Sequence, residues 1–348
     1  MVLEVKAKIV KMKNMDKRIM MTLLLLLSYM SVIAIGVNVD GIYYDFDKKT
    51  KTASVTFRGK YSHSYLDEYS GEVVIPSSVT YEGIEYSVTQ IGQSAFEGCV
   101  NLTSVTIPNE VKQISSYAFS GCSNISNVIL PSGVARISDG MFDGCKNLIS
   151  VVLPEGVTQI GSKAFSECSR LASISIPESV TRIENEAFFG CSSLTNILIP
   201  KKVVEIGSSA FERCIGLTSI TLPNGVKSVG DFAFRDCIGL TSIILSDSLT
   251  QLYCGVFYGC KSLTSIILPD DVNCIGSEVF YKCENLTNIT IPDGVEEIGY
   301  SAFEGCKNLT NITMPDSLKW IGDYAFYYCS SLTSLTIPEK VIEIGYSA

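Results

Sequence analysis

Apolar side chains recur with a fixed period along three-quarters of this 348-residue chain. Phenylalanine occurs eleven times at intervals of 23 residues, from Phe96 to Phe326, without one insertion or deletion. A cysteine follows each phenylalanine three residues later, and a leucine or isoleucine follows that cysteine after three more. Each unit continues with a segment such as L-T-S-V-T-I-P, in which apolar residues alternate with Ser, Thr or Asn. The chain is therefore an array of repeats.

The pattern inside one unit predicts its local structure. The alternating segment is rich in β-branched residues and is typical of a short strand. A proline then ends the strand, because proline cannot donate to a β-ladder. The next two apolar residues, such as Val111 and Ile114, turn the chain back along the other side, and glycines such as Gly161 and Gly230 supply a turn. The A-F-x-x-C segment predicts a helical turn or a 3₁₀ segment on the outer face.

A single unit of 23 residues cannot bury its own apolar side, whereas stacked units can. Equal positions then form columns in a shared core. We therefore predict a repeat solenoid of the leucine-rich-repeat type, a right-handed coil over residues 88–348 with eleven units and a truncated twelfth. A parallel β-sheet forms one face, helical or 3₁₀ turns form the other, and the body is about 50 Å long.

Both ends differ from the repeats. Residues 1–36 combine a basic start with an apolar run and small residues, which predicts a secretory signal peptide; an uncleaved membrane anchor is the alternative. After cleavage we expect no stable membrane span. Residues 37–87 contain alternating segments around DKKTK and are assigned as an N-terminal β cap, with a separate small binding module as the alternative. The chain stops at EIGYSA without a cap, so we expect a fragment of a longer protein.

Composition restricts the class of partner. Hydrophobic residues make up 46% of the chain and charged residues 18%, which is too apolar for a disordered protein. Residues 1–36 hold six basic and two acidic side chains, and the remainder has 21 Lys and Arg against 34 Asp and Glu, a net charge of −13. Such a surface repels phosphate groups, so we expect no nucleic-acid partner.

The sequence does not arrange catalytic or metal-binding groups as their chemistry requires. Eleven of the 13 cysteines share one repeat position, where neighbouring Cβ atoms lie about 4.8 Å apart, too far for a disulfide, so we expect buried free thiols. Only Cys254 and Cys274 fall out of phase, and a disulfide between them is left open. The single histidine, His63, lies among Ser and Tyr residues and is typical of a solvated loop. We expect no cofactor, no metal and no enzymatic activity.

The in-phase Phe, Cys, Leu and Pro positions resemble those of the BspA-like, treponemal-type leucine-rich-repeat family over about residues 88–348. The segment GEVVIPSSVTYEGIEYSVTQIGQSAF also looks like the entry to such arrays in bacterial surface proteins. The resemblance implies a secreted or cell-surface protein that takes part in adhesion to host matrix proteins, aggregation between cells, or contact with host cells. This implication rests on the family, because a fold does not by itself determine a function.

A binding surface is expected where strand residues point away from the core. One outward row contains five apolar side chains among Ser and Thr residues, and apolar residues on an exposed sheet favour a contact patch. The alternative is that β-branched residues simply suit strands. The candidate partner-binding residues are Ile129, Val152, Leu198, Ile244, Ile267, Thr221 and Thr290.

Two functions remain open for such a protein. The favoured function is that of an adhesin or host-interaction protein whose strand face binds a protein of the host matrix or of another cell. The other is a recognition or scaffold module of a longer secreted protein, which could bind glycans. A group of tyrosines favours the second function because sugars bind where exposed aromatic residues gather, although Trp320 is alone and these tyrosines lie off the strand face. They are Tyr281, Tyr300, Tyr324, Tyr327, Tyr328 and Tyr346.

Overall fold

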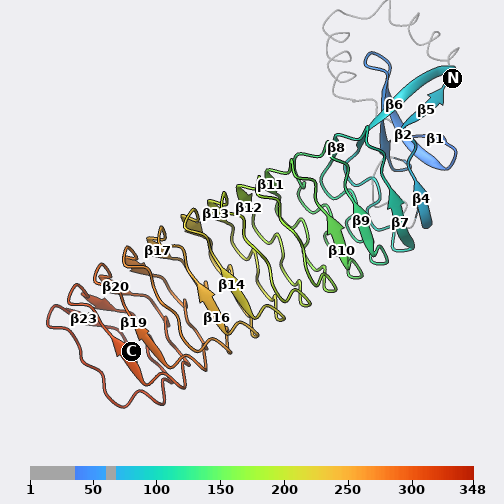
Figure 1. Ribbon diagram of the computed structural model, residues 1–348. Helices are drawn as coiled ribbons and strands as arrows, with labels where there is room; N and C mark the ends of the chain where they lie inside the picture. The colour runs from blue at the N-terminus through green and yellow to red at the C-terminus, as the bar shows by residue number, and fades with distance from the viewer. Residues whose placement is uncertain (1–35, 60–67) are drawn as a thin grey trace, which may run out of the picture.

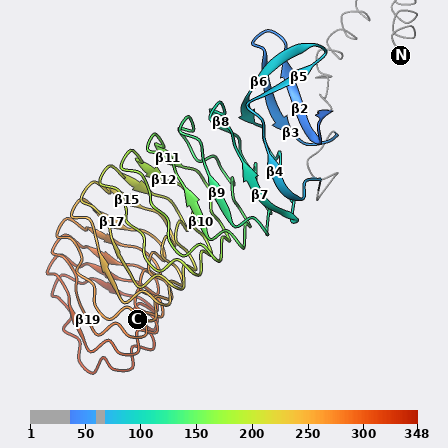
Figure 2. The same cartoon turned by 45° about the vertical axis from the view of Figure 1, so that its right-hand side comes forward.

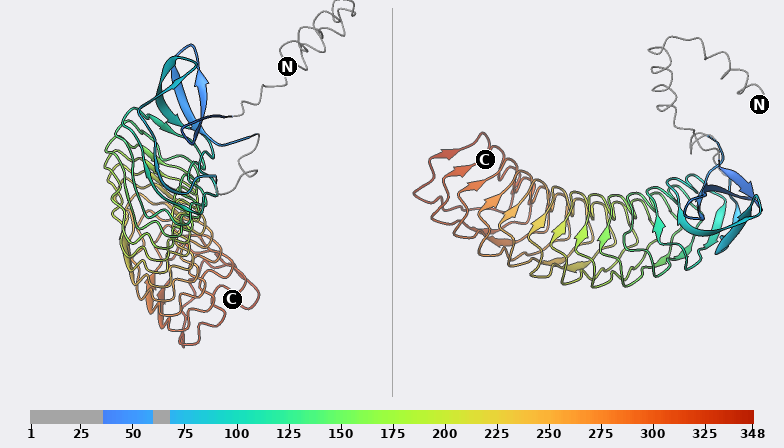
Figure 3. Two further views of the ribbon diagram at one scale, coloured as in Figure 1. Left: turned by 90° about the vertical axis from the view of Figure 1, so that its right-hand side faces the viewer. Right: turned by 90° about the horizontal axis from the view of Figure 1, so that it is seen from above.

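The computed structural model describes residues 36–59 and 68–348. The predicted signal peptide, apart from its last residue, and His63 lie outside these residues. The chain forms a leucine-rich-repeat solenoid of stacked turns, with a separate group of strands at its N-terminal end (Figure 1). Seen from above, the array is arched (Figure 3). The fold class predicted from the repeat is confirmed.

The N-terminal strands form a mixed six-stranded sheet next to the first turns of the array (Figure 2). They pair in the order β1-β2-β3-β6-β5, and β8 of the array joins β6. The pairs β3 with β6 and β6 with β8 are parallel, and the others are antiparallel. The bounds are β1 Val37–Val39, β2 Ile42–Asp47, β3 Thr52–Thr56, β5 Ser78–Tyr81, β6 Ile84–Ile91 and β8 Gln113–Ile114.

Short parallel strands form the surface that the alternating segments predict, hereafter the strand face. Val128 pairs with Val151 and Ile220 with Ile243, so partners are one repeat apart. The first strand, β4, precedes the regular repeats and pairs in parallel with β7. The bounds are β4 Gly71–Val74, β7 Leu102–Thr106, β9 Asn127–Ile129, β10 Ser150–Val152, β14 Ser219–Thr221, β16 Ser242–Ile244, β19 Asn288–Thr290 and β21 Asn311–Thr313.

A second parallel ladder follows another side of the array, where the sequence predicted only that the chain turns back (Figure 1). Each strand has two residues, and one of them, such as Ile160 or Ile183, is buried in most turns. The bounds are β11 Gln159–Ile160, β12 Arg182–Ile183, β13 Glu205–Ile206, β15 Ser228–Val229, β17 Gln251–Leu252, β18 Cys274–Ile275, β20 Glu297–Ile298, β22 Trp320–Ile321 and β23 Glu343–Ile344. The first four and the last five strands form separate sheets, and β8, at the equivalent repeat position, pairs with β6 of the N-terminal sheet.

The outer face consists of consecutive turns, and the described residues contain no helix there. The N–H of Cys168 donates to the carbonyl of Phe165 (3.2 Å), which is the spacing of a 3₁₀ turn. Two residues of each turn, here Lys163 and Glu167, have positive φ (57° and 56°), and such residues interrupt a right-handed helix. The N–H of Phe165 donates to the carbonyl of Ala187 in the next turn (2.8 Å). The expected helical turns are therefore single hydrogen-bonded turns that form a third ladder.

The phenylalanine column forms the centre of the core. Its rings are fully buried except that of Phe326, which is 8% exposed. Neighbouring rings stack with their centroids 5.2–5.9 Å apart. The ring of Tyr69 packs on the first of them, Phe96, at 4.7 Å and with a tilt of 53°. The in-phase cysteines are buried and unpaired, as predicted. Each of their thiols after the first donates to a phenylalanine carbonyl, as Cys145 does to Phe119 (3.1 Å), a bond that the sequence did not indicate.

Glycines are needed in the array because neighbouring turns approach closely. Neither Gly161 nor Gly230 has a positive φ. A Cβ atom on Gly230 would lie 2.5 Å from the backbone nitrogen of Ser208, and one on Gly161 would lie 2.8 Å from the carbonyl oxygen of Ile137. Glycine is therefore required at these positions because there is no space for a side chain, and not because the backbone has an unusual conformation.

Candidate functional site

The seven candidate residues occupy one row on the strand face. The five apolar side chains are 57–87% exposed, and Thr221 and Thr290 are exposed as well. The residues beside them in each strand are buried, because successive side chains of a strand point to opposite faces. Leu198 and Ile267 hold the same repeat position, although neither lies in an assigned strand.

Parallel pairing brings members of this row side by side. Ile129 pairs with Val152, and Thr221 pairs with Ile244. From Ile129 to Ile267 the row crosses seven turns, five of them with a large apolar side chain. At about 4.8 Å between neighbouring strands, these turns form a stripe about 30 Å long. Five exposed apolar side chains thus lie in one band on the strand face, while other exposed apolar residues, such as Ile215 and Ile238, lie outside it.

Val74 of β4 is a further member of the row that the repeat period did not reveal. Its side chain is 66% exposed, and it pairs with Thr106 of β7. Extra residues before the first regular unit interrupt the 23-residue period, so the equivalence of Val74 and Thr106 is not apparent from that period. Counting two positions back from Pro76, as one does from Pro108 to reach Thr106, would have found it.

A shallow groove of about 510 Å³ lies on the strand face beside Ile267. Among the residues that line it are Thr290, Asn288 and Asn311. The amide of Asn311 donates to Oδ1 of Asn288 (3.0 Å). Ile267 is the most exposed large apolar residue of the described chain, at 87%. The groove therefore combines an apolar side chain with hydroxyl and amide groups, and it brings together two of the candidate residues.

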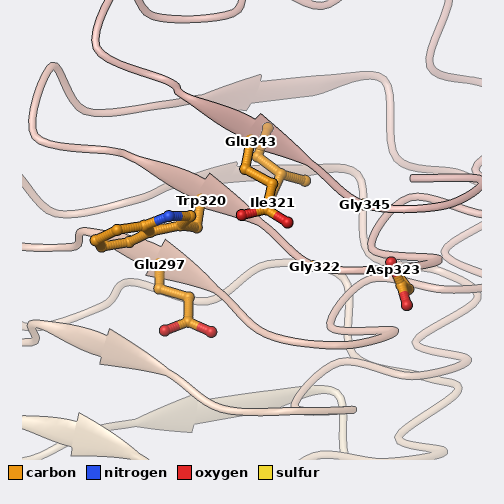
Figure 4. A pocket seen from close by; sticks show the side chains of 7 residues that line it. All are labelled: Glu297, Trp320, Ile321, Gly322, Asp323, Glu343 and Gly345. Atoms are coloured by element: carbon orange, nitrogen blue, oxygen red, sulfur yellow. The ribbon is translucent and has the colours of Figure 1, made fainter.

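A second hollow of about 380 Å³ lies on the second ladder (Figure 4). Trp320 pairs with Glu297 on one side and Glu343 on the other, and Asp323 also lines the hollow. The described residues that line it include no basic side chain, and the ammonium of Lys319 lies 5.7 Å from the indole centroid. Trp320 stands alone as a tryptophan in the sequence, and the second ladder, which the sequence did not predict, places a carboxylate on each side of it.

The eleven in-phase cysteines are buried, which makes their thiols poor nucleophiles. Burial raises the pKa of the Cys145 thiol, and it raises that of Cys329 to about 12, so these thiols stay protonated near neutral pH. Cys254 and Cys274, whose pairing the sequence left open, are both unpaired in the structure. Within the described part of the chain, no group of His, Cys, Asp and Glu side chains could hold a metal ion.

Comparison with known families identifies the repeat. The profile described as the BspA-type leucine-rich repeat region, with six copies, matches residues 76–195, 158–260, 183–283 and 250–348. The chain belongs to the BspA-type leucine-rich repeat family. The matches begin at Pro76, so they include almost all of the strand face of this BspA-type array. No curated protein is similar enough in sequence to serve as a relative for comparison.

Several solved structures resemble this BspA-type chain. A leucine-rich repeat protein from Bacteroides ovatus is 29% identical, with 87% of this chain and 95% of that chain covered and a TM-score of 0.46. A leucine rich cell surface protein from Faecalibacterium prausnitzii is 26% identical, with 90% and 95% covered and a TM-score of 0.45. The pneumococcal vaccine antigen PcpA is 20% identical, with 89% and 94% covered and a TM-score of 0.50, a similarity of fold alone.

Residues 36–59 and 68–348 of this BspA-type chain contain no helix that is long and apolar enough to cross a bilayer.

Proposed function

We propose that this protein is a secreted or cell-surface binding protein, an adhesin or host-interaction protein, whose strand face recognises a partner protein. The observation that carries the proposal is the band of exposed apolar side chains from Ile129 to Ile267. An isoleucine side chain that faces solvent on a sheet is not stabilised by burial in the core of its own chain. Covering one such side chain with a partner contributes about 1.5–3 kcal/mol, before the costs of association.

The surroundings of the band also suit a protein interface. The next outward row contains Ser and Asn side chains, such as Ser150, whose hydroxyl donates to Asn127 (2.7 Å). An apolar centre with a polar border is typical of specific protein interfaces. A band about 30 Å long matches the footprint of a standard interface, about 800 Å² on each partner.

A glycan-binding module is the second candidate function. The composition of the strand face favours a protein partner over a glycan. The described positions of the outward row hold Val, Ile, Leu, Thr and Ser, and none is aromatic. Sugar-binding sites normally present aromatic rings. The secreted location, the adhesin role and the matrix partner rest on the family resemblance and remain part of this proposal.

Charged substitutions on the strand face test the proposal. The double variant Ile244→Asp with Ile267→Asp places two carboxylates in the band. The matched control is Ile215→Asp with Ile238→Asp, because these isoleucines also lie in neighbouring turns and are 44% and 42% exposed, off the strand face. Both variants lower the net charge by the same amount, so unspecific repulsion affects them equally.

Binding is measured by surface plasmon resonance against immobilised matrix proteins and by a glycan array. We expect the wild-type chain and the control to bind a matrix protein with equal affinity. The strand-face variant should bind at least about tenfold more weakly, since two apolar contacts become desolvated charges. Equal binding by all three proteins would exclude the strand face as the site. Binding to glycans alone would replace the protein partner with a sugar.

A further inference from the structure

Aromatic side chains form a second exposed feature, on the outer turns. In three places a cation from the chain itself lies over them, and in the first of these the guanidinium carbon of Arg213 lies 5.7 Å from the Phe189 ring centroid. The guanidinium carbon of Arg235 lies 5.3 Å from the Phe232 ring centroid and 4.8 Å from that of Tyr258. The ammonium of Lys282 lies 4.9 Å from the Tyr281 centroid. These contacts indicate that a cation is a favourable ligand for exposed rings on the outer turns, because the negative face of an aromatic ring attracts a cation.

Five tyrosines near the end of the chain form a group without such a cation, hereafter the tyrosine cluster. The ring of Tyr324 meets three others nearly edge-on, with centroids 5.5–5.8 Å apart. The other four rings are 38–71% exposed. Within the described chain, no lysine or arginine lies over any of these rings. The members are Tyr300, Tyr324, Tyr327, Tyr328 and Tyr346.

Carboxylates border the tyrosine cluster on two sides. Glu304 holds the same repeat position as Tyr327, one turn earlier. Asp323 accepts a hydrogen bond from the backbone N–H of Tyr346 (2.7 Å). Asp323 also lines the hollow beside Trp320, so the negative charge continues from the outer turns to the second ladder. Rings and carboxylates together form a surface that attracts cations in two ways.

We propose that the tyrosine cluster binds arginine or lysine side chains of a basic segment on a partner protein. The cation of the partner would take the place that Arg235 and Lys282 take on the rings of the preceding turns. Glu304 and Asp323 would complement its charge, which favours association with basic over acidic partners. The site lies on the outer turns, so this proposal is independent of the strand face.

A neutral glycan would not use this combination of groups. Tyrosine rings alone could stack on a sugar, but the bordering carboxylates give no advantage to an uncharged ligand. The chain outside residues 1–36 has a net charge of −13, which further favours a basic partner. A basic protein segment is therefore the ligand that the charges of the cluster select.

The test uses the full chain and two fluorescein-labelled peptides, one with alternating Arg and Gly and one with citrulline in place of each Arg. Citrulline keeps the shape of arginine and removes its charge. Binding is measured by fluorescence anisotropy at low salt, and a neutral hexasaccharide is added as a competitor. We expect the arginine peptide to bind at least about tenfold more tightly than the citrulline peptide and to weaken as salt increases. The hexasaccharide should not compete.

Variants locate the binding site. Tyr327→Leu with Tyr328→Leu removes two exposed rings and should weaken binding of the arginine peptide about 5–30-fold. The phenylalanine pair Y327F with Y328F keeps the rings and should stay within about threefold of the wild-type chain. Tyr253→Leu is the matched control, because Tyr253 is exposed and lies outside the cluster. Unchanged far-UV circular dichroism shows that each variant is folded.

Three results would overturn the proposal. The first is equal affinity for the arginine and citrulline peptides, and the second is no binding of the arginine peptide at millimolar concentration. The third is competition by the hexasaccharide that the leucine pair abolishes, which would assign the cluster to glycans. None of these results would alter the expectation for the strand-face variants.

Discussion

Replacing Phe211 with alanine should lower the free energy of unfolding by about 3–5 kcal/mol. Phe211 is fully buried, and its ring stacks on Phe188 (5.4 Å) and Phe234 (5.5 Å). The gap lies in a column with a ring on each side, so neighbouring turns cannot fill it without disturbing their own stacking. Phe326 is 8% exposed and stacks only on Phe303 within the column, so Phe326→Ala should cost less.

Urea titration with two optical probes measures this effect. Far-UV circular dichroism reports on the whole array, and fluorescence reports on the turns around Trp320, the only tryptophan. Because each turn contacts only its neighbours, a gap at Phe211 can uncouple the two halves of the array. We therefore expect either a lower common midpoint or two separate transitions for Phe211→Ala. Phe326→Ala should shift the fluorescence transition more than the circular dichroism transition.

The control for this prediction is Phe211→Leu, which fills more of the gap and should cost less than alanine. A decrease of less than about 0.5 kcal/mol in the free energy of unfolding of Phe211→Ala would be the size expected of a surface substitution. That result would show that the ring is not in a shared dry column, and the stacking argument would be wrong.

Two further predictions concern contacts between turns. Gly230→Ala should destabilise the array because its Cβ would lie 2.5 Å from the backbone nitrogen of Ser208, whereas Gly156→Ala, with its nearest contact at 4.0 Å, should be neutral or slightly stabilising in thermal unfolding. Asp231→Ala should cost about 0.5–1 kcal/mol because it removes the acceptor for the N–H of Cys254 (2.9 Å). Asp231→Asn keeps that acceptor and should cost less in urea titration; equal losses would assign the effect to charge.

The sequence predicts the core of this protein well because one column repeats the same requirement in every turn. A residue assigned to the wrong position in one unit would disagree with the equivalent residues of the other ten units. The phase of the phenylalanines therefore places the inward residues of each strand and the unpaired cysteines correctly. The outer turns are harder to predict. Their second positive-φ position is glycine in some turns, such as Gly98, but a residue such as Arg213 in others. The short strands of the second ladder were also missed, because two residues are too few to show alternation.

The candidate surface is predictable only in part for a related reason. Outward positions such as Ile129 follow from the alternation, whereas Val74 lies before an interruption of the period and was not recognised. The carboxylates beside Trp320 come from turns that precede and follow it in the sequence. The 23-residue period already places Glu297 and Glu343 in the turns next to Trp320, but it did not show that this position forms a ladder with a hollow beside it.

Thiol labelling tests the central claim, that equal positions of successive turns share one buried column. The chain has 13 cysteines; Cys274 is exposed, Cys254 is partly exposed, and the eleven in-phase thiols are buried. With a thiol-specific reagent at pH 8, we expect Cys274 to react quickly and Cys254 more slowly in the native protein. The eleven others should react only after unfolding in guanidinium, because burial keeps them protonated and out of reach. Rapid labelling of several in-phase cysteines in the native protein, identified by mass spectrometry, would contradict the account.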